Sequence, residues 1–300
     1  MATTTNWSGL TEYIDVHRDE LIAKASASVK ELDYFDLLLG VKHKETIPTL
    51  DTTIVFHDGS ACGWNPDGSD IIGEVTIEVN PLEVEKEYCQ RDFEKSFANY
   101  QLRWAAGRET LPFEEQIVNN QLNAINEALS VAIWSGNTAA GMSGLTEILE
   151  AQSGNTTNVD FSGKTIVEQV DAMVAGIPND AFKYGYEGKV DIFMNYTQFR
   201  QYVAALNAQC CGKIGIVDAN QDEMAYIGDS RVRLVPVDGL ASYSIMVAAP
   251  ARSLAYGTDV ENSENIYDMW FDRKDAKFLF RVLFMAGVQV KLPGFTVVGQ

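Results

Sequence analysis

The clearest pattern of apolar positions in the chain predicts one long amphipathic helix from Pro112 to Trp134. Its apolar residues recur at steps of three and four, which places them on one face of a helix. These residues are Val118, Leu122, Ile125, Leu129, Ala132 and Ile133. Pro112 suits a first helical turn, and Gly136 follows the helix end. At about 1.5 Å per residue the helix is about 35 Å long, so we expect it to brace one side of a broad domain.

A period of two marks the stretch from Thr46 to Val79 as a long β-hairpin. Residues 52–56 form one predicted strand, and apolar and polar residues alternate in the second arm, where the apolar positions are Val75, Ile77 and Val79. Residues 57–70 between the strands are polar and contain the turn signal Asn65-Pro66-Asp67-Gly68. A two-stranded hairpin buries little of itself, so we expect this one to lean on something else.

Helical spacing is predicted on both sides of the hairpin. Apolar residues recur near helical intervals over residues 10–22 and again over residues 28–39, where Gly40 stands in the position favoured just past a helix end. After Pro81 the pattern is polar and helical as far as Tyr100. We therefore expect two helices before the hairpin and one after it.

The middle of the chain alternates helices and strands, which indicates an α+β fold. Thr165 and Glu168 form a predicted capping box at the start of a helix that ends at Pro178. A buried strand is predicted over residues 190–194, and Asn195 caps the helix that follows it.

The last part of the chain is rich in predicted strands. Residues 232–237 and 244–249 are two of them, and Pro250 can open a short helix that runs to Tyr256. Residues 266–271 are expected to pair with residues 276–286 across a polar turn.

The charge balance narrows the classes of function. The 300 residues include 42 acidic and 23 basic ones, which gives a net charge of −19. A protein that grips phosphate needs a basic face, so sequence-specific nucleic-acid binding is disfavoured. The sequence opens with no signal peptide and has no apolar run that could span a bilayer, so we expect no contact with membranes. Its four cysteines, Cys62, Cys89, Cys210 and Cys211, fit no zinc motif and are expected to be free thiols.

Two motifs resemble binding loops, but each departs from its pattern at a required position. Gly163-Lys164-Thr165 resembles the end of a phosphate-binding loop, yet Asn158 replaces the glycine that the loop needs. The stretch from Asp218 to Asp222 resembles the start of a calcium loop, but Glu223 replaces its glycine. We interpret the first as a helix cap and the second as a solvated acidic loop. We therefore expect no catalytic residue, cofactor or metal.

The order of elements and four local phrases resemble the major capsid proteins of tailed bacteriophages with the Hong Kong-97 fold. The phrases are the long helix before Ser135-Gly136-Asn137 … Gly144-Leu145-Thr146, the strand Asp191-Ile-Phe-Met-Asn195 with its helix, Arg233-Leu-Val-Pro236-Val, and the closing segment from Ile266 to Val298. The resemblance spans about Thr46 to Val298, and the order of the phrases carries more weight than any one of them.

The resemblance implies an α+β Hong Kong-97-like fold with four parts. Residues 1–45 would be an N-terminal arm, and residues 46–80 an extended β-hairpin loop that overlaps a neighbour. Residues 81–160 and 258–300 would form a peripheral domain with a long spine helix, and residues 161–257 an axial domain that packs around symmetry axes.

The resemblance also implies partners and a location. The chain would assemble with copies of itself as hexamers and pentamers, and would meet portal, scaffolding and head-completion or decoration proteins. It would enclose packaged DNA without sequence-specific binding and reside in the virion after assembly in the host cytoplasm. The residues that we expect at intersubunit contacts lie in the hairpin tip and in a later turn-rich loop. They are His57, Trp64, Asn65, Asp67, Asp70, Cys210, Asn220 and Glu223.

One departure from the family's founding member has a chemical consequence. That member links its subunits by an isopeptide bond between a lysine on the extended loop and an asparagine. This sequence has no lysine from Thr46 to Val79, so we expect no such covalent mesh.

Two other functions stay open at this level. An encapsulin-type nanocompartment shares the fold, although no N-terminal helix for cargo docking is evident. A soluble enzyme would need a convergent polar site, and the sequence indicates none.

Overall fold

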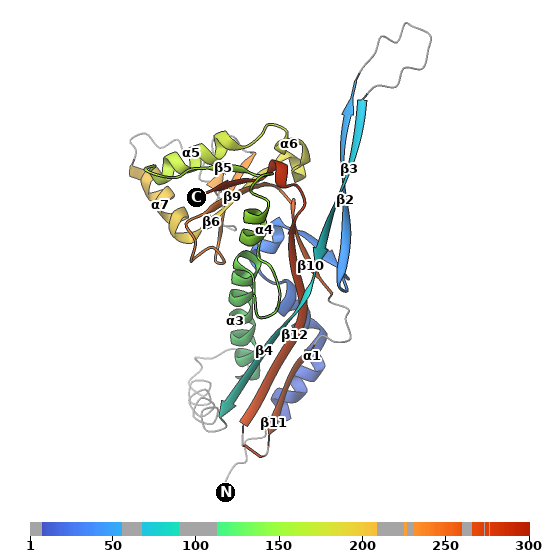
Figure 1. Cartoon of the computed structure of the whole chain (residues 1–300). Coiled ribbons are helices and arrows are strands. Elements are labelled where there is room, and N and C mark those ends of the chain that lie inside the picture. Colours follow the sequence, from blue (N-terminus) through green and yellow to red (C-terminus); the bar gives the residue numbers. More distant parts are fainter. Residues whose placement is uncertain are drawn as a thin grey trace.

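The computed structural model of the chain describes residues 8–55, 68–89, 113–208, 225–226, 231–259, 266–272, 274–275 and 277–300. The described strands form a five-stranded sheet, a six-stranded sheet and a separate two-stranded hairpin. In Figure 1 the hairpin projects away from the body, and the six-stranded sheet with its helices lies at the same end as the C-terminus. The chain therefore has the α+β architecture that its pattern predicts.

The long strand β12 (Lys277–Val290) organises the five-stranded sheet. It pairs antiparallel with β4 (Asn80–Cys89) on one side, and with β10 (Leu254–Thr258) and β11 (Ile266–Asp272) along its length. The short strand β1 (Asp36–Leu39) adds to β10 in parallel. Every second side chain of β12 is buried, beginning with Phe278, Phe280, Val282 and Phe284. One face of this sheet is therefore core, and the other is partly open to solvent.

Helices α1 (Ser8–Ala27) and α3 (Phe113–Ser135) contact each other, and α1 also contacts β11 and β12. The apolar stripe predicted for α3 is confirmed, because all of its described members are buried. Gly136 takes a φ of 78° at the helix end, and the hydroxyl of Thr146 on α4 (Leu145–Ala151) donates to the carbonyl of Trp134. Helix α1 packs on its own chain through Ile14, Leu21 and Ile22, which are all buried.

The six-stranded sheet has the strand order β5-β13-β9-β6-β8-β7. Its strands are β5 (Thr157–Val159), β6 (Val190–Asn195), β7 (Ala225–Tyr226), β8 (Val232–Val237), β9 (Met246–Pro250) and β13 (Val297–Gly299). The helices beside it are α5 (Ile166–Gly176), α6 (Ala181–Tyr184) and α7 (Tyr196–Ala208). Short 3-10 helices cover Tyr186–Gly188 and Pro293–Phe295.

Both predicted helix starts in this part of the chain are confirmed. Thr165 and Glu168 make a complete capping box at α5. Asn195 accepts a hydrogen bond of 2.7 Å from the backbone of Gln198, whose side chain accepts from the Asn195 backbone at 3.2 Å. These local signals set the helix starts because they satisfy backbone groups that a helix end leaves open.

Three predicted helices are wrong where the structure describes them, while residues 90–100 of the helix predicted after Pro81 lie outside the described residues. Residues 28–39 form a short 3-10 helix, η1 (Lys30–Tyr34), followed by strand β1. Residues 81–89 form strand β4, in which Glu83, Glu85 and Glu87 alternate with Leu82, Val84 and Tyr88. Residues 250–256 hold the end of β9, a tight turn and the start of β10. In all three places, backbone pairing with a strand distant in sequence overrides a weak local pattern.

Candidate assembly interface

Strands β2 (Lys44–Ile54) and β3 (Gly68–Glu78) form the projecting hairpin. They pair antiparallel without interruption from Lys44 opposite Glu78 to Ile54 opposite Gly68. Eleven residues at about 3.3 Å each give a ribbon about 36 Å long. Figure 1 shows that it extends beyond the rest of the molecule. The predicted hairpin is thus present, although its pairing begins at Lys44.

A small apolar cluster seats the base of the hairpin on the five-stranded sheet. Val41, Ile77, Val79 and Ala255 are its buried members. The ribbon crosses the sheet where Gly257 on β10 pairs with a glycine on β12, Gly287. A Cβ atom at Gly257 would lie 3.0 Å from side-chain carbons of both Ile77 and Val79. The seat therefore depends on a sheet surface that has no side chains at this point.

Hydrogen bonds fix the direction in which the hairpin leaves the body. The backbone N–H of Val79 donates to the carbonyl of His43 at 2.9 Å, and the side chain of Gln289 on β12 donates to the carbonyl of Thr76 at 2.9 Å. Lys44 and Glu78 add an exposed ion pair of 2.8 Å. Gln289 thus bonds the β3 arm to the body, and the backbone N–H groups of Gly40 and Val41, just before β2, donate to the carbonyl of Thr258 on β10, so the ribbon is held as an extension of the sheet.

The distal part of the ribbon has chemistry that suits contact with another chain. It pairs with no other described strand, so the outer edge of each strand keeps backbone donors and acceptors without a strand partner. The register sets Leu50 opposite Ile72 and Asp51 opposite Ile71. A long two-stranded ribbon with apolar residues is marginal alone and is a template for pairing with other chains.

Most of the predicted contact residues lie outside the described residues. These are His57, Trp64, Asn65, Asp67, Cys210, Asn220 and Glu223. Asp70 lies on β3, where the backbone register sets it opposite Thr52. The roles of these eight residues in contacts between subunits stay predictions.

A second exposed surface, which was not predicted from the sequence, lies on the outer face of the five-stranded sheet. There Trp270 on β11, Leu279 on β12 and Glu87 on β4 form one row across three strands. Trp270 is 44% exposed beside a shallow hollow of about 320 Å³. Lys277 pairs with Glu87 at 2.9 Å, and Arg281 pairs with Glu83. The period of two in residues 81–89 was the signal that could have revealed this face.

Aromatic side chains join the two large sheets into one core. The ring of Phe193 on β6 lies 5.4 Å from the ring of Trp134 on α3 and 5.7 Å from that of Phe35. Trp134 also donates a hydrogen bond of 3.0 Å to the buried carboxylate of Glu31. Burial raises the pKa of Glu31 to about 7, although hydrogen bonding by Ser130 and Trp134 opposes the rise.

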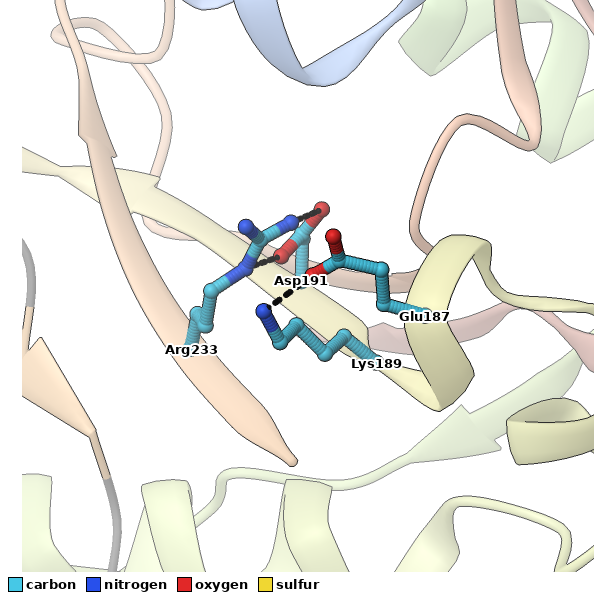
Figure 2. A network of polar contacts seen from close by, with 4 residues as sticks. All are labelled: Glu187, Lys189, Asp191 and Arg233. Atoms are coloured by element: carbon cyan, nitrogen blue, oxygen red, sulfur yellow. Dashed lines mark hydrogen bonds and ion pairs between the residues drawn. The ribbon is translucent and has the colours of Figure 1, made fainter. Parts of the chain in front are cut away.

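Figure 2 shows a polar network on the six-stranded sheet. Asp191 on β6 and Arg233 on β8 are register partners, and the guanidinium donates to both carboxylate oxygens. The nearby Lys189 pairs with Glu187. Burial raises the pKa of Asp191, and Arg233 opposes the rise. The Asp191–Arg233 pair ties two strands together within one subunit, and nothing about it points to catalysis.

Within the described residues, no group of three or more His, Cys, Asp or Glu side chains is arranged to hold a metal ion. No helix in that same part of the chain is both long and apolar enough to cross a membrane.

Comparisons with known proteins are informative at the level of structure. No protein-family model and no curated protein matches the sequence. A chain of the satellite phage P4 procapsid, which includes the size determination (Sid) protein, matches with a TM-score of 0.64 and 9% identity, over 100% of this chain and 98% of that chain. A chain from the capsid of an empty GTA particle matches with a TM-score of 0.59 and 11% identity, over 92% and 89%.

A virus-like particle from Pyrococcus furiosus also matches, with a TM-score of 0.54 and 11% identity, over 96% of this chain and all of that chain. At these identities the comparisons establish the fold. The chain has the Hong Kong-97-like fold that these capsid proteins share.

Proposed function

We propose that this protein is the structural subunit of an icosahedral capsid shell, of the kind that encloses the double-stranded DNA of tailed phages. The observation that carries the proposal is a hairpin about 36 Å long that projects from a body with a capsid-protein fold. An exposed ribbon of this kind does not stabilise an isolated globular protein, whereas in a shell it can pack against a neighbouring subunit.

The proposed mechanism is geometric. A closed shell needs many copies joined by heterologous contacts that repeat around symmetry axes. A projecting ribbon increases the surface that each copy can bury against its neighbours, and specific interfaces bury about 1,200–2,000 Å² in total. The seat on Gly257 and Gly287 fixes the angle of the ribbon, so every copy would present it to the neighbour in the same way.

We assign the parts of the chain to the roles that the fold family suggests. Residues 1–45 are the N-terminal arm, residues 46–80 the extended loop, residues 81–160 with 258–300 the peripheral domain, and residues 161–257 the axial domain. The strand order favours two adjustments. β10 belongs with the peripheral sheet, and β5 and β13 belong with the axial sheet.

The partners follow from the same proposal. Copies of the chain would form hexamers and pentamers, and portal, scaffolding and head-completion or decoration proteins would complete the particle. The net charge of −19 would keep packaged DNA from adhering to the shell and free subunits soluble.

A nanocompartment shell is the second candidate, and the match to the virus-like particle from Pyrococcus furiosus favours keeping it. The two candidates differ in cargo. Genes for terminase and portal proteins beside this one support the phage capsid, and a gene for a peroxidase or ferritin-like enzyme supports the compartment.

A truncation of the hairpin tests the proposal. Removing residues 57–70 leaves the register from Asp51 opposite Ile71 to the base unchanged. We expect the complete chain to elute as a megadalton species in size-exclusion chromatography and the truncated chain to stay soluble as small species. A matched control is Val131→Ala on the exposed side of α3, which should assemble normally. Normal shells from the truncated chain would overturn the role of the hairpin.

A further inference from the structure

An exposed arginine stacks on an exposed tyrosine where the chain passes from the six-stranded to the five-stranded sheet. The guanidinium carbon of Arg252 lies 4.1 Å from the centre of the Tyr186 ring. Arg252 lies in the turn between β9 and β10, and Tyr186 begins the 3-10 helix Tyr186–Gly188. Tyr186 is 51% exposed, and Arg252 is exposed as well. Among the residues that the structure describes, no carboxylate forms an ion pair with Arg252. The stacked pair therefore presents to solvent a cation without an ion-pair partner.

Backbone hydrogen bonds hold the two turns that carry this pair. The N–H of Tyr186 donates to the carbonyl of Ala251 at 3.0 Å, and the N–H of Ala251 donates to the carbonyl of Lys189 at 3.0 Å. The N–H of Arg252 donates to the carbonyl of Tyr34 at 3.2 Å. Because the pair is already held in place, a partner that binds it loses less conformational entropy.

Each of the two turns contains a residue in the left-handed region of backbone conformation. Arg252 has a φ of 61° and Glu187 a φ of 58°, and within the described part of the chain these are the two non-glycine residues with positive φ. Glycine adopts this conformation without strain. An arginine in such a position indicates that its side chain has a use that outweighs the backbone strain.

The charges beside the pair leave Arg252 as the available cation. Lys189 pairs with Glu187 at 2.5 Å, and Arg233 donates to both carboxylate oxygens of Asp191 (Figure 2). A hydrogen bond from Lys189 lowers the pKa of Glu187, and the charges of Arg233 and Arg252 lower it further. Lys189 and Arg233 thus bind the two carboxylates of the network. Three cations and two carboxylates give this patch a net positive charge in a chain whose net charge is −19.

The projecting ribbon has the opposite charge. Residues 45–79 contain no lysine or arginine. Their acidic residues are Glu45, Asp51, Asp58, Asp67, Asp70, Glu74 and Glu78. The period of two places Asp70, Ile72 and Glu74 on one face of β3, and the register sets Leu50 opposite Ile72. A face with an apolar pair between two acidic positions complements an aromatic ring that carries a cation.

We propose that Arg252 and Tyr186 form the site that receives the ribbon of an adjacent copy, with the carboxylate of Asp70 or Glu74 bound to the Arg252 guanidinium. This inference rests on the proposed shell function and names the surface that the ribbon meets. A guanidinium binds a carboxylate through two parallel hydrogen bonds, and the Tyr186 ring fixes the plane of the guanidinium. Arginine and tyrosine are also enriched among the residues that dominate the binding energy of interfaces.

Arg252→Gly tests the receiving site with the complete chain. Glycine suits a φ of 61°, so this variant should fold as stably as the wild type, which thermal melting checks. Light scattering then gives the protein concentration above which shells form, and Arg252→Gly should raise it at least about fivefold. Tyr186→Phe keeps the ring and should assemble as the wild type. Lys30→Ala removes another exposed cation, on η1, and should also assemble normally.

A neutral ribbon, Asp70→Asn with Glu74→Gln, identifies the partner of the arginine. It should raise the concentration for assembly by a similar factor, and adding Arg252→Gly to it should cause little further loss, because both changes remove the same contact. Fully additive losses would overturn the proposal. So would binding of linear DNA by the wild type and not by Arg252→Gly, which would assign the site to phosphate.

The same measurements separate this inference from the shell function. Normal assembly of Arg252→Gly would refute the receiving site and leave the shell function standing. A wild-type chain that forms no shells would refute both.

Discussion

Gly257 and Gly287 face each other across β10 and β12, and a Cβ atom on Gly287 would collide with the carbonyl oxygen of Glu78. The pair therefore makes a flat place at which the hairpin base can cross the sheet. A tight backbone approach of this kind is a use for which glycine is suited.

Gly287→Ala should destabilise the protein by about 1–3 kcal/mol, because the added carbon forces the hairpin base away from its seat. Chemical denaturation followed by circular dichroism measures the change in unfolding free energy. Gly294→Ala is a matched control, since a Cβ atom there meets no atom within 4 Å. Equal stability of both variants would show that the hairpin does not rest on Gly287.

Arg233→Ala should cost about 3–5 kcal/mol of unfolding free energy, because it leaves the carboxylate of Asp191, 1% exposed, buried without its partner. Lys277→Ala breaks the exposed pair with Glu87 and should cost about 1 kcal/mol or less. Both are measured by urea denaturation at neutral pH. The account of the network in Figure 2 is wrong if the two variants lose the same amount.

Stability should fall as the pH rises from about 4.5 through about 7, because burial raises the pKa of Glu31 to about 7. The stabilisation of the folded state by neutral Glu31 is complete below pH 4.5, where the residue is protonated in both the folded and the unfolded protein. It is lost as the pH rises through about 7, where the folded protein must also ionise Glu31. The interval between the two values corresponds to about 3 kcal/mol. Glu31→Gln stays neutral and should remove this part of the pH dependence, as melting temperatures from pH 5 to pH 8.5 will record.

Mature particles should dissociate into single chains in a denaturing gel. No lysine lies between Thr46 and Val79, so the hairpin has no amine for an isopeptide bond. Boiled samples should therefore run at the mass of one chain under reducing conditions. A ladder of covalent oligomers would contradict the prediction.

The sequence predicts the elements whose signals are local. The stripe of α3, the caps at Thr165 and Asn195, and the pairing of β11 with β12 all follow from residues close together in the chain. Strands β1 and β10 were missed because their pairing joins residues more than 200 positions apart, Asp36 with Ala255. No local period encodes such a contact.

The sequence predicts the projecting hairpin in part, but it does not predict the tertiary contacts that hold the hairpin and the core. The hairpin was foreseen from its alternation and turn signal, but its seat was not, because a glycine pair acquires meaning only when the strands are aligned. The buried hydrogen bond between Trp134 and Glu31 was also missed, since no local pattern brings together residues about one hundred positions apart. Both depend on tertiary packing.

Electron microscopy of the purified full-length protein tests the central claim most directly. The account predicts closed icosahedral shells in which the β2–β3 ribbon of each subunit lies on an adjacent copy. Isolated subunits at high concentration, or shells in which the ribbon contacts no neighbour, would contradict it.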